Sequence, residues 1–502
     1  MPPEQQEWRR LDPLMLLVHP VNELVRFFPL VLATLVFGAS GEDRGPWRWL
    51  GIAVPIALGV GRFVTTRYRI TAEQIELRRG LVSRSILTAR LDRVRTVEVT
   101  STPIHRLLGL ARVSIGTGSA ARGNDDRLQL DGLGIRQART LRAALLHRAD
   151  PAEPSTDASG AVGLPPPAEA ADRLLLRFDP GWVRYAPLTS SGVVIAAALA
   201  ALVGQLLDAT GDQLTGWSLP QLPGSPWWVL LPLGLVVAGV VLAALSILGY
   251  LVANGGYRLT VDAAGRSFHV VRGLVTTRET SLERERIRGL TLHEPLAQRL
   301  VGAARLDAAV TGLDRRSGGS ALLTPTAPAH VVTSLGTGML DGSPALVVPL
   351  RRHGPRALRR RYYRAAAGLA LPLVVAAVLS SYDAGWRWAL VPTALLLLGA
   401  EPLARDRYRR LGHHLDERFL VVSSGTFTGS RMVLERDGII GWNIQQSWFQ
   451  RRAGLCDLVA TTSAGRQSCT AYDVPEPVAV ALAEAAVPGL VGQFRSPPPA
   501  PA

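Results

Sequence analysis

The sequence predicts a membrane protein of mixed α and β structure. Three helical hairpins, six helices in all, are each followed by a small β-rich module with a C-terminal capping helix. The composition is 47% hydrophobic and only 19% charged, whereas soluble domains carry roughly 25% charged residues. Uncharged windows occur in three close pairs, and a similar polar segment follows each pair. These three observations together indicate a repeated unit made of a hairpin and a module.

Each pair of uncharged windows predicts one transmembrane hairpin. The windows are Phe27–Gly41, Trp49–Gly61, Tyr185–Leu207, Trp227–Ala253, Ala365–Tyr382 and Trp388–Ala400. A full span takes about 20 apolar residues, so the first, second and sixth windows need flanking Arg side chains that snorkel to the interface. For each short pair, a buried core hairpin is the alternative interpretation.

The distribution of arginine predicts the orientation of the hairpins. The turns inside the pairs contain acidic residues such as Asp208, Asp212 and Asp383, whereas Arg residues cluster before and after the pairs. The positive-inside rule then places both termini and the long segments between pairs in the cytoplasm. We therefore expect a multi-pass protein of the cell (plasma) membrane, with the lipid bilayer as a partner. Much of the net charge of +15 is explained in this way without nucleic acid.

An internal repeat runs through the three modules. A shift of 193 residues places Gly80 on Gly273, and a shift of 345 residues places Gly80 on Gly425. Without a gap, the same shifts align Arg106 with Arg299 and Arg451. Three gap-free copies at fixed offsets indicate one structural unit used three times.

Period-two hydrophobicity within the modules predicts short strands. "RYRITAEQIELRRG" reads as strand, turn and strand, and Val94, Val97 and Val99 mark the apolar positions of a later strand. Each module ends in a predicted helix, of which the middle one is interrupted by Gly336 and Gly338. Several strands and one helix predict a small, partly open barrel that is capped at one end.

These features divide the chain into eight segments. They are an N-terminal segment with hairpin 1 (1–66), module 1 (67–150), a Pro/Ala-rich linker (151–180), hairpin 2 (181–254), module 2 (255–350), hairpin 3 (351–405), module 3 (406–494) and a disordered tail (495–502).

The pattern "YRIT…RRGLVSR…LDRVRTVEV…P..RLLGLARVSI" resembles the bacterial pleckstrin-homology-like (PH-like) domain of YdbS/YdbT-like integral membrane proteins. The resemblance is strong in the first two repeats and weaker in the third. It implies a seven-stranded, helix-capped domain after each transmembrane hairpin. It also suggests a role in envelope homeostasis or in resistance to membrane-active agents.

Two sets of repeated residues are candidates for structure and for lipid contact. The repeat glycines Gly80, Gly273 and Gly425 each follow a strand and predict turns with positive φ. Arg side chains on a strand face beside a bilayer attract anionic headgroups, and an ordinary solvated face is the alternative. The candidate lipid-contact residues are Arg78, Arg79, Arg84, Arg93, Arg95, Arg272, Arg286 and Arg288.

The third repeat differs from the other two in its aromatic content. It has glycines at 438 and 441, near where the earlier repeats carry Arg, and it gains Trp442, Trp448 and Phe449. Exposed aromatic groups mark contact surfaces, so these three residues are candidate partner contacts. Local core packing is the alternative.

We expect no catalytic, cofactor or metal site. His413 and His414 are adjacent and would point to opposite faces of a strand, which makes them a poor metal pair. Cys456 and Cys469 fit no zinc or disulfide spacing and predict ordinary packing cysteines. Phosphate-loop, zinc-protease and nucleophile-elbow patterns are missing from the sequence.

The sequence therefore favours a non-enzymatic membrane protein that uses cytoplasmic modules to contact protein or anionic lipid. The expected protein partner is another membrane protein of the same family or a second copy of the chain. A six-span transporter or channel component is the main alternative, although the window centres lack the ionisable residues that ion pathways use. A membrane enzyme is a third hypothesis, for which no paired acid and base recur between the repeats.

Overall fold

The computed structural model describes most of the modules and three long helices. The described residues are 8–16, 18, 63–71, 74–80, 85–90, 96–116, 128–138, 172–189, 227–311, 320–383 and 390–490, with single residues between 53 and 61, at 140 and 141, and at 385 and 387. The chain forms two compact units. The first contains residues 1–178, 251–286 and 312–314, and the second contains 179–250, 287–311 and 315–502.

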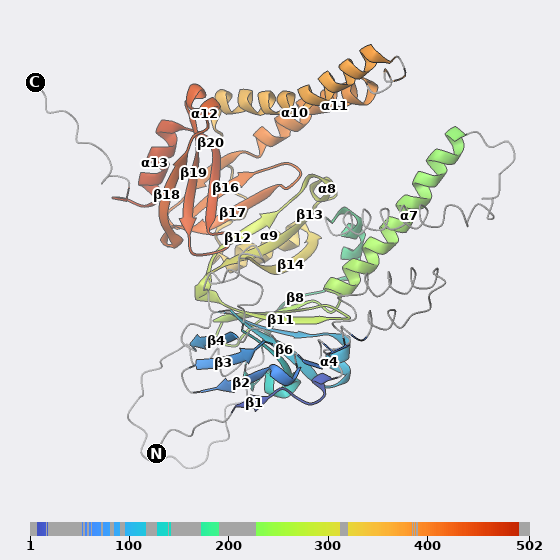
Figure 1. Cartoon of the computed structure of the whole chain (residues 1–502). Helices are drawn as coiled ribbons and strands as arrows, with labels where there is room; N and C mark the ends of the chain where they lie inside the picture. Colours follow the sequence, from blue (N-terminus) through green and yellow to red (C-terminus); the bar gives the residue numbers. More distant parts are fainter. Residues whose placement is uncertain are drawn as a thin grey trace, which may run out of the picture. The chain divides into compact units, whose positions relative to one another are not determined.

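Each repeat contributes two half-sheets of three antiparallel strands. We call them the N-half and the C-half (Figure 1). The N-halves are β2 (Arg67–Ile70), β3 (Gln74–Arg79) and β4 (Ser85–Arg90); β9 (Arg258–Val261), β10 (Ser267–Arg272) and β11 (Thr277–Glu283); and β15 (Gly412–Leu415), β16 (Phe419–Ser424) and β17 (Ser430–Glu435). The C-halves are β5 (Thr96–Ser101), β6 (Leu110–Gly116) and β7 (Leu128–Gly134); β12 (Ile287–His293), β13 (Ala303–Val310) and β14 (Ser320–Pro328); and β18 (Ile439–Gln445), β19 (Leu455–Thr462) and β20 (Ser468–Pro475).

The repeat glycines end the second strand of each N-half. Their φ values are 133° at Gly80, 102° at Gly273 and 86° at Gly425, a region that L-residues with a Cβ avoid. At Gly273 an added Cβ would lie 2.0 Å from the carbonyl oxygen of Thr276. The glycine is therefore required by the turn itself.

In the first unit, the strands form two sheets. One has the order β1-β2-β3-β4, where β1 (Arg9–Arg10) pairs with β2, and the other has the order β7-β6-β5-β11-β10-β9-β8, where β8 is Arg173–Arg177. The core of module 1 contains alternate apolar side chains of both half-sheets, among them Ile75, Leu77, Val97 and Leu130. This alternation is what the period-two pattern predicts for a sheet with one buried face.

In the second unit, a sheet of order β14-β13-β12-β17-β16-β15 joins modules 2 and 3, and β18-β19-β20 form a second sheet. The core of module 3 lies among the strands of its two half-sheets and the capping helix α13 (Glu476–Ala486). The capping helix of module 2, α9 (Ala329–Met339), forms despite its two glycines. Gly336 is buried there, and an added Cβ would lie 2.3 Å from Leu346.

The other helices are short connections or long apolar helices. The short ones are α4 (Pro103–Leu107), α8 (Leu296–Leu300) and α12 (Trp448–Ala453), with 3-10 helices η3 (Pro180–Leu188), η5 (Arg284–Arg286), η7 (Pro344–Leu346) and η9 (Arg436–Gly438). The long ones are α7 (Trp227–Asn254), α10 (Gly354–Tyr382) and α11 (Leu390–Arg409). Helices α10 and α11 pack side by side as a hairpin (Figure 1).

The expectation of six spanning helices is not supported. Among the described residues, two helices are long and apolar enough to cross a membrane, Pro232–Asn254 in α7 and Gly354–Tyr382 in α10. Helix α11 has an apolar stretch of modest length and then carries Glu401, Arg405 and Asp406. The window at Tyr185 begins inside η3, where Tyr185 is buried in the protein. The first window and most of the second and third lie outside the described residues.

Two further expectations need correction, one about a boundary and one about the sheets. The linker predicted at 151–180 ends earlier, because β8 and the start of η3 lie within that range. The modules are not separate barrels, because neighbouring modules share a sheet. The N-half of module 2 pairs with the C-half of module 1, and the N-half of module 3 pairs with the C-half of module 2. Strand periodicity predicts which residues alternate, but it does not determine which sheet edge a strand joins.

Candidate functional site

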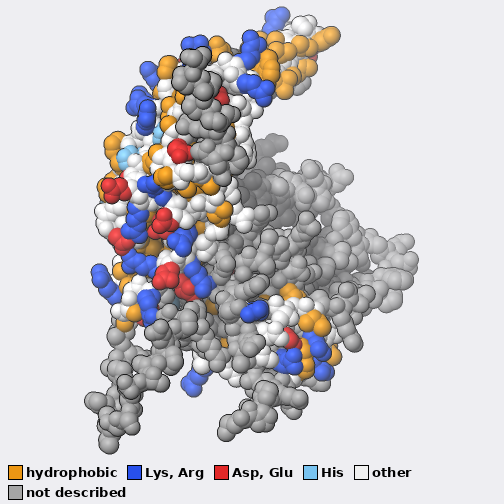
Figure 2. Space-filling model, turned by 90° about the vertical axis from the view of Figure 1, so that its left-hand side faces the viewer, with side chains coloured by type: hydrophobic (Ala, Val, Ile, Leu, Met, Phe, Trp, Pro, Cys, Tyr) orange, Lys and Arg blue, Asp and Glu red, His pale blue; other side chains and the backbone are white. Residues whose placement is uncertain are grey.

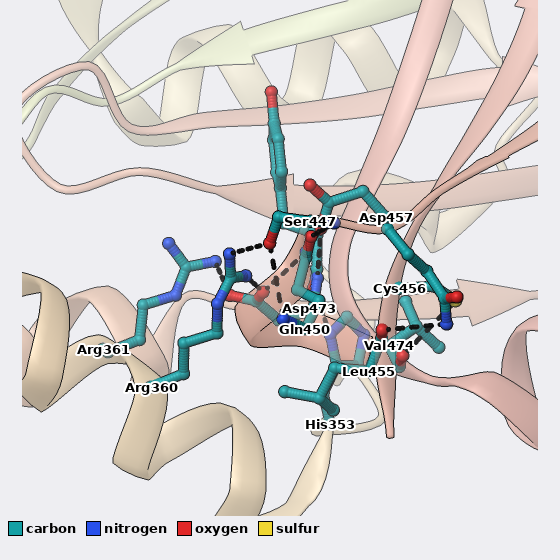
Figure 3. Close-up of polar contacts among 12 residues, drawn as sticks. His353, Arg360, Arg361, Ser447, Gln450, Leu455, Cys456, Asp457, Asp473 and Val474 are labelled. Carbon is teal, nitrogen blue, oxygen red and sulfur yellow. Dashed lines mark hydrogen bonds and ion pairs between the residues drawn. The ribbon is translucent and has the colours of Figure 1, made fainter. Parts of the chain in front are cut away.

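The start of helix α10 is fixed to module 3 by a buried carboxylate. Asp473 of β20 is 0% exposed and has a φ of +54°. Its carboxylate forms ion pairs with both Arg360 and Arg361, the latter at 2.7 Å from Nη2 to Oδ2. Figure 3 shows both guanidinium groups reaching from α10 toward Asp473. A buried carboxylate is tolerated only when it is paired, so this contact fixes the helix in one position on the module.

A second layer of hydrogen bonds holds Asp473 in place (Figure 3). The Nε2 group of Gln450 donates to Asp457 Oδ1 at 2.7 Å and to Asp473 Oδ1 at 3.1 Å. The backbone N–H of Asp473 donates to the same Asp457 oxygen at 2.8 Å. Burial raises the pKa of the Asp457 carboxyl, while Arg360, Gln450 and Arg361 lower it. The network thus connects α10, α12, β19 and β20 in one rigid assembly.

Two buried histidines lie beside this network. His353, at the N-cap of α10, places Nδ1 2.7 Å from the carbonyl of Tyr472 and Nε2 2.9 Å from Nδ1 of His413. Because a carbonyl only accepts, Nδ1 of His353 carries a proton, and in the neutral ring Nε2 accepts from His413. Burial is the main cause that lowers the pKa of each histidine to about 4. Both imidazoles are therefore neutral at physiological pH, and His413 is the hydrogen-bond partner of His353.

An apolar surface faces outward on the same module. We call Ile440, Ile444, Trp448 and Phe449 the apolar edge. These side chains are 63%, 43%, 60% and 70% exposed, respectively. They extend from β18, the outer strand of its three-stranded sheet, onto helix α12. Large apolar groups gathered at one place on a surface mark an interaction site.

Local structure holds the two aromatic side chains outward. Ser447 and Gln450 form a capping box at the start of α12, with Gln450 buried beneath. Trp448 and Phe449, the first two residues of that helix, are then turned away from the core. Their rings pack edge to face at 5.0 Å, and the Arg452 guanidinium lies 5.0 Å from the Trp448 ring. The buried network thus lies directly behind the exposed surface.

Trp442 is placed differently from the two other aromatic candidates. Its ring is half-buried and packs against the core of module 3. The Nε1 atom is buried and has no hydrogen-bond partner among the described residues. Trp442 therefore supports the inner face of β18, whereas Trp448 and Phe449 belong to the exposed edge.

The basic residues predicted to contact lipid do not form one free face in the described part of the chain. Arg78 lies over the ring of Trp8 at 3.9 Å, Arg286 pairs with Glu283 at 2.5 Å and Arg288 pairs with Glu435 at 3.4 Å. Figure 2 shows basic and acidic side chains interspersed on the face it presents. Arg272 is half-buried in β10, and Arg79 is in β3. Arg84, Arg93 and Arg95 lie outside the described residues.

A polar cleft of about 290 Å³ lies beside the pairing of β12 with β17. Within it, Asp307 meets His293 at 3.2 Å and Arg305 at 3.1 Å. These contacts satisfy Oδ2 of Asp307, and its Oδ1 has no partner among the described residues. Among those residues, no group of three or more His, Cys, Asp or Glu side chains is arranged to hold a metal ion.

The cysteines are packing residues in the core of module 3. Both are free and buried. Burial raises the pKa of the Cys456 thiol to about 11 and of the Cys469 thiol to about 12. Since the thiolate is the reactive form, neither side chain is a nucleophile at neutral pH.

Sequence reasoning missed most of the buried network and half of the apolar edge. Asp473 is an acid among alternating apolar positions of "CTAYDVP", which signals an internal ion pair. Arg360 and Arg361 belong to the Arg cluster before the third pair of windows, and in the sequence that cluster indicates only membrane orientation. Ile440 and Ile444 carry an ordinary strand pattern, and nothing in that pattern distinguishes an outer strand from an inner one.

Comparison with known families gives three matches to one model, described as the bacterial PH domain. The matched residues are 24–149, 195–333 and 365–486, which together cover more than half of the chain. Comparison with curated proteins and with solved structures found no match. Each matched segment contains one N-half and one C-half, in the order that the three-fold sequence repeat predicts. The chain therefore belongs to the bacterial PH domain family and contains three copies of the domain.

Proposed function

We propose that this chain is a non-enzymatic integral membrane protein whose PH-like modules recruit a protein partner at the cytoplasmic face of the membrane. The observation that carries the proposal is the apolar edge of module 3. Its four large side chains lie outward on a module whose interior is otherwise well packed. PH-like domains suggest interaction with protein or lipid, and an apolar surface with few free charges favours protein.

The long helices support the membrane placement. Val236 and Val240 of α7 are 62% and 64% exposed, and Leu371 of α10 is 71% exposed. Figure 2 shows apolar side chains gathered over the α10–α11 hairpin. Apolar helix faces of this kind are stable in hydrocarbon and are costly in water.

The buried network supports the location of the edge. Because α10 is tied to module 3 through Asp473, that module stays next to the membrane end of the helix. The apolar edge is then presented near the membrane surface to neighbouring membrane proteins. Restricting a partner to the same plane raises its effective concentration, which makes a small surface sufficient.

Site-specific photocrosslinking tests the contact. A photoreactive amino acid replaces Phe449 or Trp448 in the full-length protein, and the same group at the exposed Val347 serves as the control. We expect one protein to be captured in native membranes from both aromatic positions and not from Val347. The additional change Ile444→Glu should abolish that capture. Capture of lipid alone would contradict a protein-contact function and favour lipid binding.

A physiological role in envelope homeostasis is tested by deletion. Loss of the chain should change sensitivity to membrane-active agents, and a variant with Trp448→Glu and Phe449→Glu should reproduce the deletion. Unchanged sensitivity across a broad panel would contradict this role. Transport of a defined solute by the purified protein in liposomes would instead establish the transporter alternative.

A further inference from the structure

The pairings between modules, which we call junctions, use the same two strands each time. In the first junction β5 of module 1 pairs with β11 of module 2, and in the second β12 of module 2 pairs with β17 of module 3. In both cases the first strand of a C-half meets the third strand of the next N-half. The chain therefore contains two examples of one kind of sheet extension.

The two junctions also share one register. Glu98 faces Thr280 in the first, and Thr291 faces Met432 in the second. Glu98 and Thr291 are equivalent residues, because they lie 193 positions apart. Thr280 and Met432 are also equivalent to each other, because they lie 193 and 345 positions after Leu87 of the first repeat. A one-residue slip would move every side chain to the opposite face, so the shared register shows that the junction is a specific contact.

Among the described strands, one of each kind has a partner on one side and none on the junction side. Strand β4 of module 1 pairs with β3 on one side, and β18 of module 3 pairs with β19 on one side. In the described part of the chain, no strand lies on the other side of either. Strand β18 also repeats the register irregularity of β12, at Ile439/Gly441 and Ile287/Gly289, respectively. It is thus structurally prepared for the same junction.

Side chains at these two edges are more exposed than the equivalent side chains at the two junctions, as expected where a neighbouring strand is missing. At one junction position, Val99 and Leu292 are 3% and 2% exposed, whereas the equivalent Ile444 is 43% exposed. On the opposing strands, Ser281 and Val433 are fully buried, whereas the equivalent Thr88 is exposed. Burying the exposed groups would yield roughly 25 cal/mol per Å² of apolar surface.

An arginine at the end of each junction gives independent support. Arg106 donates to the carbonyl of Leu274 at 3.1 Å, across the first junction. Arg299 donates at 2.6 Å to Asp406 of α11, the helix that leads into the N-half of module 3. The equivalent residue of the third repeat is Arg451, which is exposed and has no side-chain polar contact in the described part of the chain. A junction arginine is therefore present beside the edge strand β18 as well.

We infer that β18 of one molecule pairs with β4 of a second copy of this chain, which extends the sheet in the register of the two internal junctions. This inference rests on the proposed protein-contact function and names the partner. The predicted register places Ile444 opposite Ile86, Asn443 opposite Leu87 and Trp442 opposite Thr88. Ile86 is 61% exposed in the single chain, so two exposed isoleucines become cross-strand neighbours. The contact is head to tail and uses two different edges, as in heterologous oligomers.

Cysteine crosslinking between two separately tagged chains tests this inference. One chain carries Ile86→Cys and the other Ile444→Cys, and both are produced together in native membranes as full-length proteins. Both positions are exposed, so the substitutions leave the cores intact. The native cysteines are buried and stay unreactive. Facing Cβ atoms of paired strands are close enough for a disulfide, and we expect a disulfide-linked dimer of the two tagged chains.

The matched control moves one cysteine by a single residue. Ile86→Cys is combined with Asn443→Cys, which places the two sulfur atoms on opposite faces of the sheet. We expect about tenfold less crosslinked dimer from this pair. Equal crosslinking of both pairs, or none of either, would contradict the inferred register.

Three further variants identify the occupant. Arg451→Ala should reduce the disulfide yield severalfold, whereas Arg466→Ala, an exposed arginine in the β19–β20 turn, should not. A single chain with both Ile86→Cys and Ile444→Cys should form linked oligomers. A disulfide confined to the monomer would show that the chain pairs its own edges and would overturn the inference.

Failure of the inference and failure of the proposed function give different results. If photocrosslinking at Phe449 captures a different protein while the cysteine pairs give no dimer, the contact function stands and the second copy is excluded. If neither experiment captures a protein, the proposed function and the inference are both wrong.

Discussion

At the residue scale, the buried carboxylate of Asp473 is the feature that most constrains the structure. It is fully buried and is opposed by two arginines whose side chains are 15% and 12% exposed. Removing one member of such a group leaves the other charges buried without compensation, which costs more than the group contributes when it is complete. The network is therefore a strong constraint on how α10 joins module 3.

We expect Asp473→Asn to destabilise the protein by about 3 kcal/mol, because two arginines lose their counter-charge. Asparagine tolerates the positive φ at this position as aspartate does, so the backbone is not an additional cause. Thermal unfolding of the purified protein measures the change. The matched control is Asp437→Asn in η9, where the carboxylate is exposed. Equal stability of the two variants would show that the buried charge is unimportant.

The histidine pair predicts a dependence of stability on pH. For His353 and His413 the folded pKa of about 4 lies below the ordinary value of 6.5. The unfolded chain therefore binds more protons between these values, and stability is full above pH 6.5 and falls as the pH drops toward 4. The loss for one histidine is about 3 kcal/mol. Arg361, Arg351 and His414 disfavour the protonated rings and Asp457 favours protonation of His353.

The measurement is the difference between two pH profiles of unfolding. A variant with His353→Gln and His413→Gln retains the carboxylates of the parent protein, so their titration cancels. We expect a shallower decline below pH 6.5 for the variant. Parallel profiles would mean that the two histidines do not titrate in the folded protein as their burial implies.

The sequence predicted these residues to different degrees. The turn glycines, the packing cysteines and the outward aromatic residues Trp448 and Phe449 follow from local patterns and from composition. The pairing of His353 with His413 joins residues 60 positions apart in the chain, and no local pattern contains such a contact. Asp473 and Gln450 also depend on tertiary contacts that only the folded module creates.

At the element scale, the repeat made the strand positions predictable. Fixed offsets of 193 and 345 residues carry β5 onto β12 and β18 to within two residues at each end. The choice of sheet partner was not predictable in the same way. A strand with one buried face satisfies its pattern equally well at either edge of a sheet. For this reason the sequence did not predict that neighbouring modules share sheets. Strand β8 was missed because it directly follows a Pro-rich segment.

The orientation of α10 and α11 leads to a labelling prediction. Arg residues lie at the module ends of both helices, and Asp383 follows the far end of α10. We expect Asp383→Cys to react with a membrane-impermeant maleimide in intact cells. A cysteine in place of Ser463, in the β19–β20 turn, should react only after permeabilisation. Reaction at Ser463 in intact cells, or equal protection of both positions, would contradict the cytoplasmic placement of the modules.

At the scale of the whole molecule, the half-sheets of neighbouring modules are joined by strand pairing. Two junctions are made internally, and in the described part of the chain one junction edge of each kind, on β4 and on β18, has no strand beside it. Open sheet edges attract further strands and are normally blocked by charge or proline. At β18 the chain instead places Ile440, Ile444 and two aromatic side chains. This composition is not that of a protected edge, and it supports the proposed contact.

Amide hydrogen exchange at β18 tests the central claim, that this edge is a contact site in the membrane. The full-length protein is labelled in native membranes and again as a monomer in detergent, and β18 is compared with the internal strand β12. We predict that β18 amides exchange as slowly as those of β12 in the membrane and much faster in the monomer, because edge amides lose their partners. Equally fast exchange of β18 in both preparations would contradict the account, since it would mean that no partner covers the edge.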